Sequence, residues 1–124
     1  MNCKVEKSKI KGVIDCPSNK SYTHRGIFLA SLAGNNSKVE NVLLSADTKA
    51  TIEACKKLGA IIEINNSSII VKESIKIDTK VPEIDTGNSG TTIRIAMGIA
   101  GLFSEEITLT GDDSIQKRPM QPLL

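Results

Sequence analysis

The strongest constraint on the fold of this chain is an internal repeat. Three pairs of identical residues share a spacing of 69 positions: Asn19 and Asn88, Thr23 and Thr92, and Arg25 and Arg94. At a spacing of 66 positions there are two further identical pairs, Leu43 with Leu109 and Asp47 with Asp113, and one pair of similar hydroxyl residues, Thr48 with Ser114. The repeated unit of about seventy residues is longer than the usual solenoid period. The 124 residues therefore hold more than one copy, and the sequence ends inside the second.

Both copies predict the same order of strands and helices. In the first copy, strands are expected at residues 3–6, 9–14 and 39–44, helices at 20–33 and 46–58, and a hairpin at 61–72. In the second copy, a helix is expected from residue 90 to Phe103, a strand at 106–110, and a further helix after Pro119. Residues 26–33 carry no charge, so the first helix is expected to be buried on every side. The pattern predicts an α/β fold.

The composition excludes several classes of protein. A net charge of +2 and 2% aromatic residues give no basic surface or stacking platform for nucleic acid. The cysteines are three in number and form no CxxC pair, so neither a disulfide framework nor a zinc site is expected. The longest uncharged stretch lies between Arg25 and Lys38, too short to cross a bilayer. We expect a cytoplasmic protein without nucleic-acid or membrane partners.

The rare arginines and the helix starts suggest where a ligand binds. Only three of the sixteen basic residues are Arg, the side chain that forms bidentate hydrogen bonds with carboxylate and phosphate groups. Polar or Gly-rich loops with basic neighbours precede each expected helix start, and such starts attract anions. The candidate residues are Lys20, Ser21, Arg25, Gly90, Thr91 and Arg118. The combination predicts a site for a small molecule with several negative charges.

Simpler interpretations exist for individual residues. The run from Gly87 to Gly90 is typical of a turn with a helix cap, and Lys20 alone is typical of a solvated surface. Arg94 lies one turn into an apolar helix, so we expect it in a buried structural pair. His24 is expected to be a structural neighbour of the helix start. The remaining candidates are expected to be turn or cap carboxylates: Asp47, Asp112 and Asp113.

Three motifs in order carry a resemblance to a known family. They are the segments at residues 17–25 (PSNKSYTHR), 87–94 (GNSGTTIR) and 109–120, which includes Lys117-Arg118-Pro119-Met120. Together they resemble the 5-enolpyruvylshikimate-3-phosphate synthases of the enolpyruvyl transferase family. The sister family that acts on UDP-N-acetylglucosamine is the weaker match, because it has Asn where this chain has Ser21 and a reactive Cys that residues 114–117 lack.

The resemblance implies a reaction and roles for the candidate residues. The family transfers the enolpyruvyl group of phosphoenolpyruvate to the 5-hydroxyl of shikimate 3-phosphate and releases phosphate, without metal or organic cofactor. By this likeness Lys20 would contact both substrates and assist proton transfer, while Ser21 and Arg25 would bind shikimate 3-phosphate. Phosphoenolpyruvate would be bound by Lys20, Gly90, Thr91 and Arg118.

The resemblance also implies an architecture. The family fold is an inside-out α/β barrel of βαβαββ units, with helices inside four-stranded sheets and three units in each of two domains. Residues 1–16 would supply strands to the other domain, and residues 17–124 would form the first one and two-thirds units of this one. The full-length enzyme is expected to be a monomer, whereas the chain by itself is expected to be inactive and to self-associate. The alternative is a stand-alone module that binds small phosphorylated acids.

Overall fold

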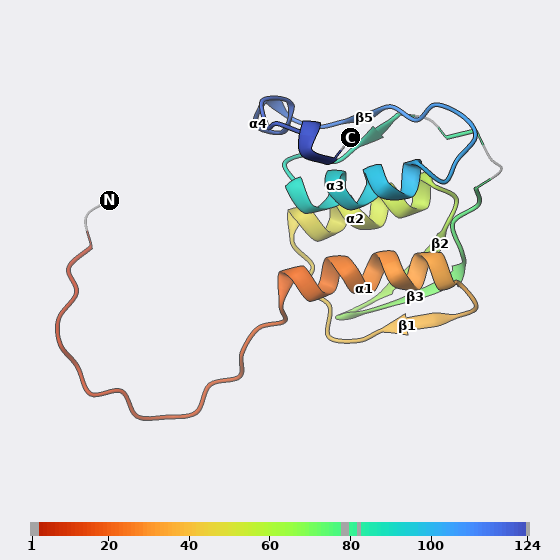
Figure 1. Cartoon of the computed structure of the whole chain (residues 1–124). Coiled ribbons are helices and arrows are strands. Elements are labelled where there is room, and N and C mark those ends of the chain that lie inside the picture. The colour runs from red at the N-terminus through yellow and green to blue at the C-terminus, as the bar shows by residue number, and fades with distance from the viewer. Residues whose placement is uncertain (1–2, 78–79, 82, 124) are drawn as a thin grey trace.

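The structure is a computed structural model that describes residues 3–77, 80–81 and 83–123. Along the chain it contains α1 (Lys20–Ala33), β1 (Ser37–Val39), α2 (Ala46–Lys57), β2 (Ile61–Asn65), β3 (Ser68–Glu73), β4 (Ile84–Asp85), α3 (Gly90–Ala100), β5 (Leu109–Thr110), α4 (Asp113–Gln116) and the 3-10 turn η1 (Gln121–Leu123). Figure 1 shows the three long helices side by side between two groups of strands. The predicted α/β class is confirmed.

Two small sheets flank the helices. The first is antiparallel with the order β1-β3-β2, and α1 packs against β1 and β3. A tight turn joins β2 to β3, with Asn66 in the left-handed region at φ 51°. This confirms the predicted hairpin. The second sheet is the parallel pair β4-β5, which α3 connects, so the second copy of the repeat forms a strand–helix–strand unit.

An aliphatic core fills the space between the helices and the two sheets. Its largest fully buried apolar side chains are Ile27, Ile52, Leu58, Ile69 and Ile84. Each such side chain contributes about 1.5–3 kcal/mol when it leaves water. The core therefore needs few aromatic residues.

The predicted starts and ends of the first two helices are confirmed. Asn19 caps α1 by accepting the amide of Tyr22, and Ser45 caps α2 in a reciprocal capping box with Thr48. The chain leaves α1 at Gly34 with φ 62°, and a Cβ there would lie 2.8 Å from the Cβ of Ser74. Glycine at this position satisfies both the left-handed backbone and the close packing.

The strands predicted within residues 3–16 are wrong. These residues form no helix or strand and extend away from the rest of the molecule in Figure 1. Their apolar side chains stand in water; Ile10 and Val13 are each 98% exposed. A strand needs a neighbouring strand to bond its amides and carbonyls, and the described part of the chain gives this segment none.

The expectation that the first helix is buried on every side is also wrong. Ile27 and Phe28 are buried, but Leu29 is 67% exposed and Leu32 43% exposed. The described elements that pack against α1 are α2, α3 and the first sheet, and they leave the side with Leu29 and Leu32 uncovered. A helix without charged residues can be buried on every side, but only if other parts of the protein pack against each of its faces.

Three predicted boundaries shift in the structure. β1 covers Ser37–Val39, whereas the strand was predicted at residues 39–44. The strand ends early because Asn41 turns the backbone into the left-handed region at φ 53°. α3 ends at Ala100 instead of Phe103, where Gly101 forms the cap. In place of the helix expected after Pro119, the described residues form the 3-10 turn η1. The short helix α4 lies before Pro119, and Asp112 caps it by accepting two backbone amides, as expected of a turn or cap carboxylate.

Candidate functional site

The three long helices begin at the same end of the molecule. In Figure 1 the starts of α1, α2 and α3 lie together, and α4 is beside them. The Nζ of Lys20 on α1 lies 2.7 Å from a carboxylate oxygen of Asp47 on α2. The hydroxyls of Thr51 on α2 and Thr92 on α3 are 2.7 Å apart. Helix starts carry unpaired amides and partial positive charge, so this shared end favours anions.

Lys20 is the first residue of α1 and points toward α2. Its side chain is 52% exposed and that of Asp47 is 30% exposed. An ion pair at this exposure contributes about 0–1 kcal/mol. Asp47 therefore holds the ammonium in place without binding it so tightly that an anionic ligand could not compete.

Ser21 and Arg25 occupy the exposed side of the first turns of α1. The guanidinium of Arg25 lies 5.0 Å from the centre of the Tyr22 ring, within reach of a cation–π contact. This contact leaves the guanidinium donors free to face solvent. Ser21 and Thr91, in the first turns of α1 and α3, are both exposed. Their predicted contacts with ligand stay predictions.

Two guanidinium groups crowd the backbone at Gly90, where α3 begins. A Cβ placed on Gly90 would lie 2.5 Å from Nη1 of Arg118 and 2.9 Å from Nη1 of Arg94. Arg94 also donates to the carbonyl of Gly90 at 3.1 Å. The absence of a side chain at this position therefore lets both cations approach the first turn of the helix. Together they form the most positive part of the site.

Arg118 is held in place by polar side chains of the neighbouring loops. Its Nη2 lies 3.4 Å from Oδ1 of Asn88 and 3.4 Å from the Ser114 hydroxyl. The amide nitrogen of Asn88 donates to Asp112 at 2.6 Å, which turns its oxygen toward Arg118. The backbone amide of Ile115 is the main reason that the pKa of Asp112 is lowered. Asp112 is thus both the α4 cap and the acceptor that orients Asn88.

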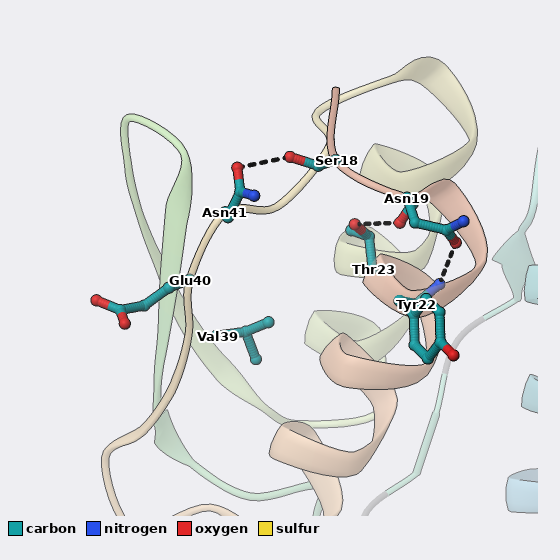
Figure 2. A pocket seen from close by; sticks show the side chains of 7 residues that line it. All are labelled: Ser18, Asn19, Tyr22, Thr23, Val39, Glu40 and Asn41. Carbon is teal, nitrogen blue, oxygen red and sulfur yellow. Dashed lines mark hydrogen bonds between the residues drawn. The ribbon is translucent and has the colours of Figure 1, made fainter. Parts of the chain in front are cut away.

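A hollow of about 230 Å³ opens beside the start of α1. Figure 2 shows its lining, in which Ser18 donates to Asn41 and Asn19 bonds to Tyr22 and Thr23. Glu40 is the one charged residue among those that line it. Three hydrogen bonds join polar groups of its lining, and the carboxylate of Glu40, which accepts from Lys38, is unfavourable for an anion. The helix starts therefore suit an anion better than this hollow does.

The structure brings some predicted residues together and leaves others apart. Gly90 and Arg118 meet, as the predicted phosphoenolpyruvate group requires. Lys20 is paired with Asp47, which the sequence suggested only as a cap. The prediction of a buried pair for Arg94 is wrong, because its side chain is exposed and reaches back to Gly90. The repeat itself signalled this residue, since Arg94 and Arg25 are equivalent positions.

Two further observations bear on the kind of site. Within residues 3–77, 80–81 and 83–123, no three His, Cys, Asp or Glu side chains gather as a metal-binding group. The same residues contain no helix that is long and apolar enough to span a membrane.

The fold and the site define a repeat-built α/β protein that gathers basic side chains at its helix starts. The chain belongs to the EPSP synthase (3-phosphoshikimate 1-carboxyvinyltransferase) family, whose model matches residues 5–124. A 3-phosphoshikimate 1-carboxyvinyltransferase of Nitrosopumilus maritimus is 82% identical over 124 residues, which are all of this chain and 29% of that protein. One of Methanococcus maripaludis is 50% identical over 119 residues, 94% of this chain and 27% of that protein.

A solved structure supports the same assignment. The EPSP synthase of Acinetobacter baumannii superposes with a TM-score of 0.78 and 29% sequence identity, over 90% of this chain and 27% of that one. The chain thus spans between a quarter and a third of the length of the proteins that it matches.

Proposed function

We propose that this chain forms part of the substrate site of a 3-phosphoshikimate 1-carboxyvinyltransferase. This enzyme transfers the enolpyruvyl group of phosphoenolpyruvate to the 5-hydroxyl of shikimate 3-phosphate and releases phosphate. The observation that carries the proposal is the pair of guanidinium groups at Gly90, at the end of the molecule where α1 begins with the half-exposed Lys20. Each substrate carries a phosphate and a carboxylate, so each needs more than one cation.

The candidate residues take distinct roles in this proposal. Arg25 and Ser21 bind shikimate 3-phosphate, with Arg25 on its carboxylate. Gly90, Thr91 and Arg118 bind phosphoenolpyruvate. Arg94 is an addition to this set, because it lies as close to the first turn of α3 as Arg118 does. Lys20 stands at the start of α1 and contacts both substrates.

The same side chains explain how catalysis would be assisted. In the first step the 5-hydroxyl oxygen bonds to C2 of phosphoenolpyruvate and gives up its proton to a base, while the methylene carbon gains a proton and becomes a methyl group. In the second step phosphate leaves C2 and the methyl group loses one proton, which restores the carbon–carbon double bond. Charge moves within the phosphate and carboxylate groups during both steps. Fixed cations that bond more strongly to the redistributed charge lower the barrier. Lys20 would assist proton transfer, as the family likeness implies, and Asp47, 2.7 Å from its ammonium, holds that group in position.

The proposal includes the architecture of the whole protein. Residues 1–16 join a second domain, and residues 17–124 form one and two-thirds units of a three-unit domain in an inside-out α/β barrel. The second domain closes over the helix starts and excludes water. We place this monomeric, cofactor-free enzyme in the cytoplasm, where the free thiols of Cys3, Cys16 and Cys55 stay reduced.

A reconstitution assay tests this proposal. Release of phosphate from phosphoenolpyruvate and shikimate 3-phosphate is measured with the 124-residue chain alone and with the chain plus the remaining part of a full-length relative. We expect turnover only in the mixture. Arg118→Met in the mixture should remove most of the activity, with Lys117→Met as the matched control. Turnover by the chain alone, or none in the mixture despite complex formation, contradicts the proposal.

The stand-alone binding module is the second candidate, because both groups of cations lie within the 124 residues. An NMR titration separates the two. Saturable shifts at Lys20, Arg25 and Gly90 with micromolar affinity for shikimate 3-phosphate would favour the module. Binding of UDP-N-acetylglucosamine instead would favour the sister family.

A further inference from the structure

Four buried polar side chains connect the starts of the three long helices. Nδ1 of His24 on α1 lies 2.6 Å from the hydroxyl of Thr51 on α2, and that hydroxyl lies 2.7 Å from the hydroxyl of Thr92 on α3. Thr92 in turn lies 2.6 Å from the hydroxyl of Ser89, the N-cap of α3. All four residues are at most 2% exposed. We call His24, Thr51, Thr92 and Ser89 the hydroxyl relay.

The hydroxyl relay runs one helical turn below the surface groups of the site. His24 follows Lys20 by four residues on α1, and Thr51 follows Asp47 by four residues on α2. Residues four apart lie on the same face of a helix. The exposed Lys20–Asp47 pair and the buried His24–Thr51 bond are therefore two successive contacts between the same helix faces.

The internal repeat shows that this arrangement is specific to these positions. Thr23 is the equivalent of Thr92, yet its hydroxyl bonds to the carbonyl of Asn19 and the amide of Leu43 within the first copy. The equivalent of His24 is Ile93, which has no polar group. The repeated backbone alone therefore does not produce the relay.

The three hydroxyls of the relay have partners in either direction of donation. Burial lowers the pKa of His24, so its ring is neutral and carries one N–H. If Nδ1 accepts, the hydroxyls of Thr51, Thr92 and Ser89 can all donate toward it. If Nδ1 donates, the backbone carbonyl of Asp47 accepts the additional hydroxyl proton, since it lies 3.4 Å from the Thr51 hydroxyl and 3.5 Å from the Thr92 hydroxyl. In both arrangements Nε2 of His24 is the relay atom that lacks a partner among the described residues.

Such a chain fixes helix positions more narrowly than apolar packing does. Hydrogen bonds between hydroxyls hold a distance within a few tenths of an ångström, whereas apolar contact has no preferred direction. A shift of one helix along another would leave several members unpaired at once. The relay therefore sets how far the Lys20 end of α1 lies from the Gly90 end of α3.

We propose that the hydroxyl relay positions the two halves of the substrate site, and that Thr51 is its central positioning residue. This inference rests on the proposed function. None of the four side chains needs to touch substrate. They act by keeping Lys20 and the guanidinium pair at Gly90 at a fixed separation, so that both act on the same reacting atoms.

Steady-state kinetics of the full-length protein that contains this chain test the proposal. Thr51→Val keeps the shape of the side chain and removes its hydroxyl, and we expect kcat to fall about 10- to 100-fold with KM changed less than about threefold. Thr51→Ser keeps the hydroxyl and should stay within about twofold of the parent kcat. Ile69→Val is the control for general destabilisation, because Ile69 is buried in β3 and lies outside the relay.

The proposal is overturned if Ile69→Val lowers kcat as much as Thr51→Val at equal loss of stability. It is also overturned if Thr51→Ser lowers kcat as much as Thr51→Val does.

If the parent protein shows no turnover, the proposed function fails, and the hydroxyl relay is then tested by NMR alone. The NMR spectra are recorded on the 124-residue chain, in which His24 is the single histidine, so its ring nitrogens are assigned without ambiguity. Thr92 does not contact His24 directly but bonds to Thr51, which does. Thr92→Val should therefore shift the NMR signal of His24 Nδ1, and an unchanged signal overturns the proposal.

Discussion

Gly90 is the residue at which backbone and cationic side chains come closest. Gly90→Ala would place a methyl group 2.5 Å from Nη1 of Arg118 and 2.9 Å from Nη1 of Arg94. Both neighbours are the far ends of flexible side chains, so they can move and folding should be little affected. The cations would then be displaced from the first turn of α3. We expect the KM for phosphoenolpyruvate to rise about tenfold, equivalent to about 1.4 kcal/mol of binding, in assays of the full-length protein.

Gly98→Ala in the same helix is the matched control. Nothing lies within 4 Å of a Cβ at Gly98. Alanine in a helix interior should raise the free energy of unfolding by about 0.5–1 kcal/mol and leave KM unchanged. Equal effects of the two substitutions on KM would show that Gly90 serves the helix and not the ligand.

Cys55 makes the stability of the folded chain depend on pH. Its side chain is fully buried, and burial raises the pKa of its thiol to about 12 from an ordinary value of 9.0. Between these two values the unfolded chain loses the thiol proton while the folded chain keeps it, so stability falls as pH rises. The slope from this group approaches about 1.4 kcal/mol per pH unit. Urea unfolding between pH 8 and pH 11 measures it, and Cys55→Ala should remove this part of the slope.

At the scale of elements, α1 depends on its cap. The side chain of Asn19 accepts the amide of Tyr22 at 2.9 Å, and Lys20 follows directly. Asn19→Ala should lower the free energy of unfolding by about 1 kcal/mol, measured by urea denaturation. Asn19→Asp preserves the acceptor and should cost much less. If both variants unfold alike, the cap does not determine the stability of α1.

Elements whose signals lie within a few residues were predicted well. The helices predicted at residues 20–33 and 46–58 and the hairpin predicted at 61–72 depend on local backbone chemistry, which the structure shows as caps at Asn19 and Ser45 and left-handed residues at Gly34 and Asn66. The strands predicted in residues 3–16 were wrong, because a strand also depends on a partner elsewhere. Asp112 is a helix cap, as expected, but the helix it caps, α4, was not predicted, and residues 121–123 form a 3-10 turn where a helix was expected.

At the scale of the whole molecule, one apolar surface stands out. Leu29 and Leu32 of α1 and Ile95 and Ile99 of α3 line a hollow of about 190 Å³ beside Phe28 and Arg25. We expect the isolated chain to associate with itself through this surface, because exposed apolar patches favour contact. Sedimentation should show a mass that rises with concentration, and Leu29→Lys combined with Leu32→Lys should abolish the rise. A concentration-independent mass for the parent chain would contradict this.

The sequence by itself determined the repeat, the α/β class, most helix limits and the residue types of the anion site, because these follow from periodicity, capping and local charge. Only the tertiary structure decided that Arg94 is exposed beside Gly90, that Asp47 holds Lys20, and that polar side chains of three helices form one buried chain of hydrogen bonds. These contacts join residues 27 or 41 positions apart, or depend on which side of a helix its neighbours cover. Chain order does not specify such distances; packing does.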